Sequence, residues 1–317
     1  MDVLPLVFMV LMGVSVLVYV VLDGFDLGVG MLMPAATYEE QSVMVSSIGP
    51  FWDANETWLV LGVGLLLAAF PAANGIVLTA LYLPVVAMLV GLMLRGVAFE
   101  LRIKAHGWHR ELWNWLFWFG SFAASFFQGV MLGRYVTGFE QGPGYWLFAM
   151  LVGASLCGGY VLMGATWLIH KTEGELQRKS IAWTRWGLLW VALVSLATPL
   201  VSETVREKWF SFPRMIYVSI LPLATLAAWL WVWSSLKKSD LKPFVGSLAI
   251  YALAFAGLAY SLFPYVIIDR MTIWQAAAHE SALKFVLVGA LLVLPFLIGY
   301  TFYVYRLFGG KMKDGAY

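Results

Sequence analysis

The chain has 317 residues, of which 62% are hydrophobic and only 12% are charged, and its mean hydropathy is +0.82. A soluble domain carries about 25% charged residues, so this composition excludes a water-exposed globular surface and predicts a protein embedded in a lipid bilayer. The net charge of +2 gives no indication of nucleic-acid binding, and the single cysteine, Cys157, excludes an internal disulfide.

Nine apolar stretches approach or exceed the length of about 20 residues that a helix needs to cross a membrane. They are continuously apolar rather than alternating, which favours helices over a β-barrel. In chain order they are Leu4–Met33, Ala54–Phe70, Gly75–Phe99, Glu111–Tyr135, Tyr145–His170, Trp183–Ser202, Phe212–Trp233, Val245–Ile268 and Ala282–Tyr305. The sequence therefore predicts one all-α, polytopic membrane domain over residues 1–317, packed as two four-helix bundles and one extra helix.

The basic residues predict the orientation of these helices. With the N-terminus outside and nine crossings, 14 of the 20 Lys and Arg residues fall in cytoplasmic segments and six fall outside. Lys and Arg gather in cytoplasmic loops, so we expect an external N-terminus and a cytoplasmic C-terminus. No soluble domain interrupts the helices.

The first helix carries two acidic residues, Asp23 and Asp26, beside a GxxxG pair formed by Gly24 and Gly28. A spacing of three places both carboxyls on one helical face, and Asp23 lies roughly 30 Å along the helix from Leu4, in its cytoplasmic half. A charge inside a bilayer costs a few kcal/mol, so the pair needs a role. Two interpretations stay open: a proton-conducting or cation-coordinating pair, and a hydrogen-bonded pair that ties the first helix to a neighbour.

A second acidic pair, Asp53 and Glu56, opens the second helix in the run Gly-Pro-Phe-Trp-Asp-Ala-Asn-Glu-Thr-Trp at 49–58. Asp53 is placed as an N-cap, and Glu56 would complete a capping-box-like arrangement. A cap at the membrane edge could also be a point of proton uptake, so both roles stay open.

The third helix ends in Leu94-Arg95-Gly96-Val97-Ala98-Phe99-Glu100-Leu101-Arg102. Arg95 is predicted to neutralise an acidic residue of the first or second helix, because pairing lowers the cost of burying a charge. Arg102 and Lys104 are predicted to be ordinary cytoplasmic basic residues.

The histidines bear on haem binding. A haem within the membrane needs axial ligands at depth, usually His. His106, His109, His170 and His279 lie in loops or at a helix end. We therefore expect this chain to ligate neither a haem nor a metal by itself.

Three of the segments just quoted carry a family resemblance. Residues 23–32, the run at 49–58 and residues 94–100 resemble sequence blocks of subunit II of cytochrome bd-type quinol oxidases. Two later segments, Phe263-Pro264-Tyr265 and Tyr305-Arg306-Leu307-Phe308-Gly309, fit weakly. The chain is short for this family, mainly in its later external loops, which leaves the subtype open, including the cyanide-insensitive branch.

The resemblance implies a bacterial inner-membrane complex with subunit I, which would hold two b-type haems, one d-type haem and the quinol-oxidising loop. Such a complex reduces oxygen to water and generates a proton motive force without pumping. Whether a small single-helix accessory subunit joins it stays open. Carried over, Asp53, Asp23 and Asp26 would be proton-path residues, with Glu100 in support and Trp52 and Arg95 as neighbours. Glu56, paired with Asp53 on the second helix, is predicted to belong to the same path.

Two other functions compete with this one. In a secondary transporter, Asp23 and Asp26 would coordinate a cation, but no matching element in the second half of the chain suggests an inverted repeat. In a structural scaffold, the acids would be only caps and interhelical contacts.

Overall fold

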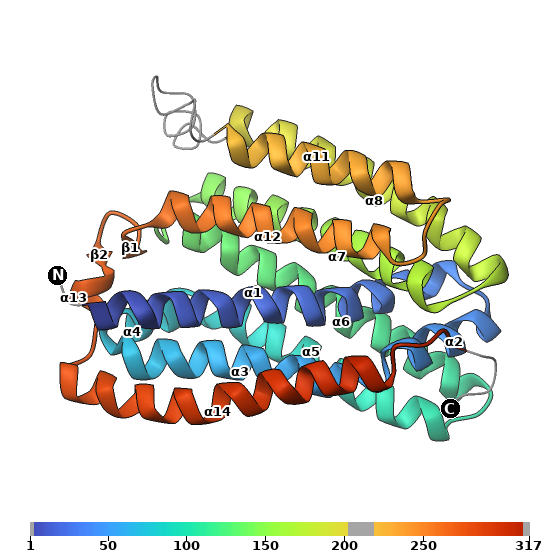
Figure 1. Ribbon diagram of the computed structural model, residues 1–317, viewed down its shortest axis with the longest axis horizontal. Helices are drawn as coiled ribbons and strands as arrows, with labels where there is room; N and C mark the ends of the chain where they lie inside the picture. Colours follow the sequence, from blue (N-terminus) through green and yellow to red (C-terminus); the bar gives the residue numbers. More distant parts are fainter. Residues whose placement is uncertain (1–2, 202–218, 313–317) are drawn as a thin grey trace.

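The computed structural model describes residues 3–201 and 219–312, with the side chains of 197–201 left out. Figure 1 shows long helices that run side by side, with the start of the first described helix and the end of the last at opposite ends. The helices are α1 (Val3–Leu32), a 3-10 turn η1 (Met33–Ala35), α2 (Tyr38–Ile48), α3 (Trp52–Ala69), α4 (Pro71–Ala80), α5 (Tyr82–Lys104), α6 (Trp108–Val136), α7 (Pro143–Lys171), α8 (Gly174–Val201), α11 (Ile220–Ser235), α12 (Lys242–Leu262), α13 (Ile273–Ala276) and α14 (Glu280–Leu307). Strands β1 (Tyr265–Ile267) and β2 (Met271–Thr272) form a small antiparallel hairpin.

The all-α membrane architecture is confirmed. Among the described residues, six helices are long and apolar enough to cross a membrane: α1 with η1, α5, α6, α7, α12 and α14. The helix α3 carries two acidic residues in its first turns, and α11 is apolar but has only 16 residues. The predicted stretches Trp183–Ser202 and Phe212–Trp233 both run into residues 202–218, which lie outside the described part of the chain.

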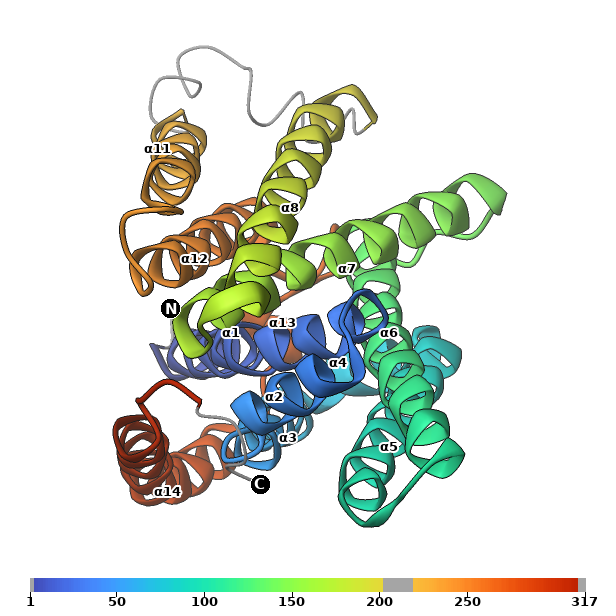
Figure 2. The same ribbon diagram turned by 90° about the vertical axis from the view of Figure 1, so that its right-hand side faces the viewer.

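Helix α1 lies at the centre of the packing. It contacts α7 and α3 along much of its length and also packs against α6, and Figure 2, which looks along the helices, places it between α7 and α3. The predicted close approach at the GxxxG pair is confirmed, because a Cβ added at Gly28 would overlap the Tyr160 carbonyl of α7. At the same crossing, a Cβ at Gly164 would overlap the α1 backbone at Gly28 and Val29. Small residues on both helices therefore set this contact.

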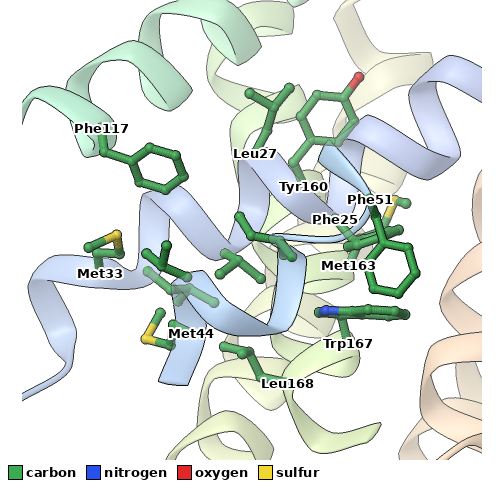
Figure 3. Close-up of a cluster of buried hydrophobic side chains, with 14 of the residues drawn as sticks. Phe25, Leu27, Met33, Met44, Phe51, Phe117, Tyr160, Met163, Trp167 and Leu168 are labelled. Atoms are coloured by element: carbon green, nitrogen blue, oxygen red, sulfur yellow. The ribbon is translucent and has the colours of Figure 1, made fainter. Parts of the chain in front are cut away.

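A large apolar cluster fills the space where α1, α2, α6 and α7 meet (Figure 3). Phe25 of α1 stacks on Trp167 of α7 with ring centroids 4.2 Å apart, and Phe51 meets the same indole edge-on at 5.6 Å. Met33 and Met44 complete its wall beside the end of α1. This cluster fixes the half of α1 that carries the acidic residues.

The predicted single helix Gly75–Phe99 is wrong, because the chain forms α4 and α5 with a break at Leu81, whose φ is −105° and ψ is 12°. Pro84 has no N–H with which to bond the Ala80 carbonyl, so the hydrogen-bond ladder cannot continue there. Similarly, Pro71 separates α3 from α4, since the residue before a proline avoids helical backbone and Phe70 has φ −131° and ψ 57°.

Two connections differ from the sequence-based expectation. The segment between the first two predicted helices contains α2, which begins at a capping box between Thr37 and Glu40. The predicted stretch Val245–Ile268 is too long, because α12 ends at Leu262 and the next residues enter the β1–β2 hairpin. Tyr135 of α6 donates a hydrogen bond to the Val266 carbonyl (2.6 Å) and holds this hairpin against the helix ends.

Candidate functional site

The acidic residues of α1 lie inside the protein. Asp23 and Asp26 are fully buried, three residues apart, on the face of α1 that meets α3 and α5. Their neighbours Gly24 and Gly28 face α7, so the small residues of this segment make the helix contact while the carboxyls point the other way.

Arg95 of α5 neutralises this region. Its Nη1 lies 2.6 Å from Asp23 Oδ1 and 3.3 Å from Glu56 Oε1 of α3, and its Nη2 lies 3.9 Å from Asp26 Oδ2. The guanidinium is fully buried. The predicted neutralisation of an acidic residue on the first or second helix is confirmed, and Arg95 contacts acidic residues on both helices.

Close packing between α5 and α6 sets the position of Arg95. A Cβ added at Gly120 of α6 would lie 2.7 Å from the Arg95 backbone nitrogen and 2.7 Å from the Gly91 carbonyl. Only glycine lets the two backbones approach this closely. The Arg95 backbone is thus held against α6 while its side chain points toward α1.

An amide and a phenol complete the cluster. Asn55 Nδ2 donates to Asp26 Oδ2 (2.7 Å) and to the Leu22 carbonyl (3.2 Å). Tyr305 of α14 donates its hydroxyl hydrogen to Asn55 Oδ1 at 3.1 Å. Four helices therefore contribute to one buried polar group: α1, α3, α5 and α14. We call Asp23, Asp26, Asn55, Glu56, Arg95 and Tyr305 the Arg95 cluster.

The Arg95 cluster keeps unused hydrogen-bonding capacity. Asp23 Oδ2, Asp26 Oδ1 and the Nε and Nη2 atoms of Arg95 are buried and lack a hydrogen-bond partner among the described residues. A buried polar atom without a partner is costly, typically about 1–3 kcal/mol. The cluster is therefore chemically able to take up a proton or a water molecule at the carboxyl oxygens.

A second polar group begins one helical turn from Asp23. Gln128 of α6 donates to the Tyr19 hydroxyl (2.6 Å) and accepts from the Tyr160 hydroxyl (2.8 Å). All three side chains are buried. Tyr19 precedes Asp23 by four residues and so lies on the same face of α1.

Three of the predicted site residues lie apart from these contacts. Asp53 and Glu100 are exposed, and Trp52 is half-buried and packs on Phe99 with ring centroids 5.0 Å apart. Asp53 precedes Glu56 by three residues, so it shares a face of α3 with it. Glu56, with a side chain 27% exposed, joins the Arg95 cluster to this outer surface.

The predicted capping role of Asp53 and Glu56 is wrong. The N-cap of α3 is Phe51, which makes no side-chain capping bond, and Asp53 already lies in the first turn. The helix starts earlier than expected because Gly49 and Pro50 end the preceding turn, which leaves Asp53 past the capping position. Glu56 turns toward Arg95 instead of bonding back to a cap.

The interpretation of Arg102 as an ordinary surface residue is also wrong. It is only 4% exposed, and its Nε donates to Asn114 Oδ1 (2.5 Å) and its Nη2 to Ser42 Oγ (3.3 Å). Arg110 donates to the same Ser42 oxygen at 2.6 Å. Helix α2, absent from the sequence-based prediction, brings Ser42 there and covers Arg102.

The start of α2 gives a testable pH dependence. Burial alone would raise the pKa of the Glu40 carboxyl, but hydrogen bonds from Lys179 and from the Thr37 backbone outweigh it, so that the pKa is lowered. Its stabilisation is therefore present above the usual pKa of about 4.3 and is lost as the pH falls through the lower folded value. At neutral pH, Glu40→Gln should lower the free energy of unfolding by up to about 1 kcal/mol.

Thermal unfolding of the purified protein measures this difference at neutral pH and again below the folded pKa, where it should vanish. Glu39→Gln is the control, since Glu39 is exposed beside Glu40. An equal loss of stability at both pH values would contradict the stabilising role of the ionised Glu40 carboxyl.

Taken together, the fold and the Arg95 cluster define a polytopic helical membrane protein that holds several ionisable groups at depth, a feature typical of proteins that carry protons or ions. Residues 4–308 match the sequence model of the family described as cytochrome bd terminal oxidase subunit II. The chain belongs to this family and is therefore a subunit of a bacterial terminal oxidase.

Individual relatives agree with this assignment. The chain is 32% identical to the cytochrome bd ubiquinol oxidase subunit 2 of Bacillus subtilis, with 94% of each chain covered. It is 28% identical to the cytochrome bd-I ubiquinol oxidase subunit 2 of Escherichia coli, over 99% of this chain and 96% of that one. Its fold matches a chain of the bd oxidase from Geobacillus thermodenitrificans with a TM-score of 0.79 and 16% identity, over 97% of this chain and 99% of that chain. The family confirms the expected resemblance and favours an oxidase over a transporter.

Proposed function

We propose that this chain is the proton-supplying subunit of a quinol oxidase, and that the Arg95 cluster is part of a path from the cytoplasm to the site where subunit I reduces oxygen. The family supplies the reaction, in which haems in the complex pass electrons from quinol to oxygen. The observation that carries the proposal is the convergence of three carboxyl groups from two helices on one buried guanidinium.

Charge balance supports a proton in this cluster. If Asp23, Asp26 and Glu56 were all ionised, Arg95 would leave two uncompensated negative charges in or beside the membrane interior. Neighbouring carboxylates in a desolvated site do not all ionise together, so at least one of them retains a proton that it can exchange.

Glu56 and Asp53 supply the outer end of the path. The partly exposed Glu56 contacts Arg95, and the exposed Asp53 lies one helical turn earlier on the same face of α3. Protons would pass from Asp53 to Glu56 and then to Asp23 and Asp26. Glu100, also exposed, would support the local negative charge at the cytoplasmic side.

The proposal also includes the partner subunit and the arrangement of this chain in the membrane. The partner subunit I would ligate two b-type haems and one d-type haem, and this chain would ligate none. Nine helices would cross the bacterial inner membrane as two four-helix bundles and one extra helix, with the N-terminus outside and the C-terminus in the cytoplasm. The start of α1 and the end of α14 lie at opposite ends of the molecule in Figure 1, which favours an odd number of crossings. A single-helix accessory subunit would be an optional addition.

Asp26→Asn tests the path. The amide keeps the size of the side chain but cannot carry a proton, so we expect oxygen reduction to fall by on the order of 10²-fold, with full haem content. Oxygen consumption and proton uptake by the purified complex are the measurements. Asp269→Asn is the matched control, because Asp269 is exposed in the turn between β1 and β2.

Asp53→Asn, measured in the same way, tests the outer end and should also slow turnover. Normal turnover and normal haem content in both the Asp26 and the Asp53 variants would leave the acids with a purely structural role, as in the scaffold alternative.

A further inference from the structure

The end of the chain folds back onto α7. The residues that follow α14 contact Lys171, the last residue of α7. The Lys171 ammonium donates hydrogen bonds to the Phe308 carbonyl and to the Gly310 carbonyl, the latter at 3.1 Å. In return, the Met312 backbone N–H donates to the Lys171 carbonyl at 2.8 Å. Residues 308–312 are thus tied to the last residue of α7 through both its side chain and its backbone.

Lys171 is unusual for a lysine at a helix end, because it is only 1% exposed. No carboxylate lies within ion-pair distance of it in the segments 3–201 and 219–312. Its ammonium lies 5.0 Å from the ring centroid of Trp167 and 5.4 Å from that of Phe51. Burying an ammonium is costly unless it is well bonded, so the carbonyls and the aromatic faces are what hold it there.

A second contact ties the same segment to the cytoplasmic loops. Lys311 Nζ lies 2.7 Å from Asp240 Oδ2 and 3.6 Å from Glu173 Oε1. The hydrogen bond that Lys311 donates to Asp240, more than any other contact, raises the pKa of Lys311. The segment therefore joins the end of α7 to the loop between α11 and α12.

These ties lie next to the Arg95 cluster. Phe51, one of the two rings under Lys171, packs on the Tyr305 ring with centroids 4.5 Å apart. In Figure 3 the Phe51 ring lies beside the Trp167 indole, which it meets edge-on. The Tyr305 hydroxyl bonds to Asn55, which bonds to Asp26. A continuous series of contacts thus runs from Lys171 to a buried carboxyl.

Helix α14 needs such an anchor. It packs mainly against α3 and α1, and little of it is buried within this chain. Tyr305 lies near its last turn, so a small rotation of the helix end would move the hydroxyl away from Asn55. The contacts at Phe308, Gly310 and Met312 restrain this end directly after Tyr305.

We infer that Lys171 and residues 308–312 form a latch that fixes the end of α14, and that Tyr305 is a positioning residue which orients Asp26 through Asn55. This role rests on the proposed proton path, in which Asp26 takes part. The latch itself requires only the contacts of Lys171 and can be tested separately.

The latch is tested by cysteine labelling of the assembled oxidase. Met312→Cys places a thiol on a half-buried residue whose backbone N–H is bonded to the Lys171 carbonyl, and the native Cys157 is buried. Lys171→Met should raise the rate of maleimide labelling at position 312 several-fold, because the two charge-assisted hydrogen bonds that hold the segment against α7 are lost. Lys171→Arg should keep most of the protection.

Lys179→Met is the matched control, since Lys179 also lies on the cytoplasmic side but pairs with Glu40 and not with the segment. Labelling of the complex without the added cysteine gives the background. Equal labelling rates in the Lys171→Met and Lys179→Met proteins would overturn the latch.

The positioning role is tested by Tyr305→Phe, which keeps the ring on Phe51 and removes only the hydroxyl. In redox-difference infrared spectra, the carboxyl band that disappears in Asp26→Asn should shift in frequency in Tyr305→Phe, and the pH profile of turnover should shift with it. Tyr303→Phe, at an exposed position of the same helix, should change neither. Haem content should stay normal in all three proteins.

Lys171→Met should reproduce the band shift, whereas Tyr305→Phe should leave labelling at position 312 unchanged. If Lys171→Met does not assemble, removal of residues 308–317 is compared with removal of 313–317, and only the longer truncation should shift the band. An unshifted band in both Tyr305→Phe and the variant that opens the latch would overturn the positioning role. If Asp26→Asn changes neither spectrum nor turnover, the proton path fails and the positioning role with it, while labelling still decides the latch.

Discussion

Replacing Arg95 with Met is expected to abolish accumulation of the assembled oxidase. The substitution would leave Asp23 and Asp26 buried with no cation beside them, and removing one partner of a buried ion pair costs about 3–5 kcal/mol. Haem recovery from membranes, together with the amount of this chain, measures the loss. The reason is electrostatic, because methionine fills a similar volume without overpacking the site.

Two companion variants make this expectation specific. Arg270→Met removes an exposed arginine, 54% exposed, that pairs with Glu140, and it should cost no more than about 1 kcal/mol. Adding Asp23→Asn to Arg95→Met should restore part of the assembly, since it removes one of the unpaired charges. Normal haem recovery with Arg95→Met alone would show that the carboxyls do not depend on the guanidinium.

Gly28→Ala is expected to destabilise the protein strongly through packing. The added methyl group would overlap the Tyr160 carbonyl, so α1 and α7 would have to separate along the contact that holds the acidic end of α1. Overpacking costs about 1–3 kcal/mol when side chains can adjust, and here the obstacle is backbone. Thermal unfolding of the purified complex, followed by loss of haem absorbance, should move to a clearly lower temperature.

The matched control lies on the same pair of helices. Gly144→Ala adds a methyl group in the first turn of α7, where it meets no atom within 4 Å, so its unfolding temperature should not fall. Gly164→Ala opposes Gly28 and should act like Gly28→Ala, but the two effects should not add, because both act on one crossing. If Gly28→Ala unfolded at the same temperature as the wild-type protein, the close approach of α1 and α7 would not determine the stability of the fold.

The features that could be predicted from the sequence are those for which the membrane leaves few alternatives. A charged residue within an apolar run must be paired or functional, which is why Arg95 could be assigned to the acids of the first two helices. The Gly24 and Gly28 spacing likewise predicts close helix packing without knowledge of the partner. Both predictions were possible because these residues interrupt an apolar pattern and therefore need a structural reason to be there.

The rest depended on neighbours that are distant in the sequence. Asn55 and Tyr305 are 250 residues apart, and a neutral amide or phenol at the end of a helix costs too little to signal a site. Arg102 resembled a surface residue because helix α2, which covers it, is short and polar at its start. In the sequence, Lys171 looks like an ordinary lysine at the end of a helix. Its burial follows only from the position of residues 308–312 in the fold.

The distance along the chain between Asp23 and Arg95, 72 residues, has a consequence for biosynthesis. Helix α1 leaves the ribosome before its counter-ion exists, so its two carboxyls must wait, protonated or still in contact with water, until α5 is made. Stable integration of α1 is therefore a late event, completed when α5 arrives, and a ribosome stalled before codon 95 should hold an α1 that is still easily extracted from the membrane.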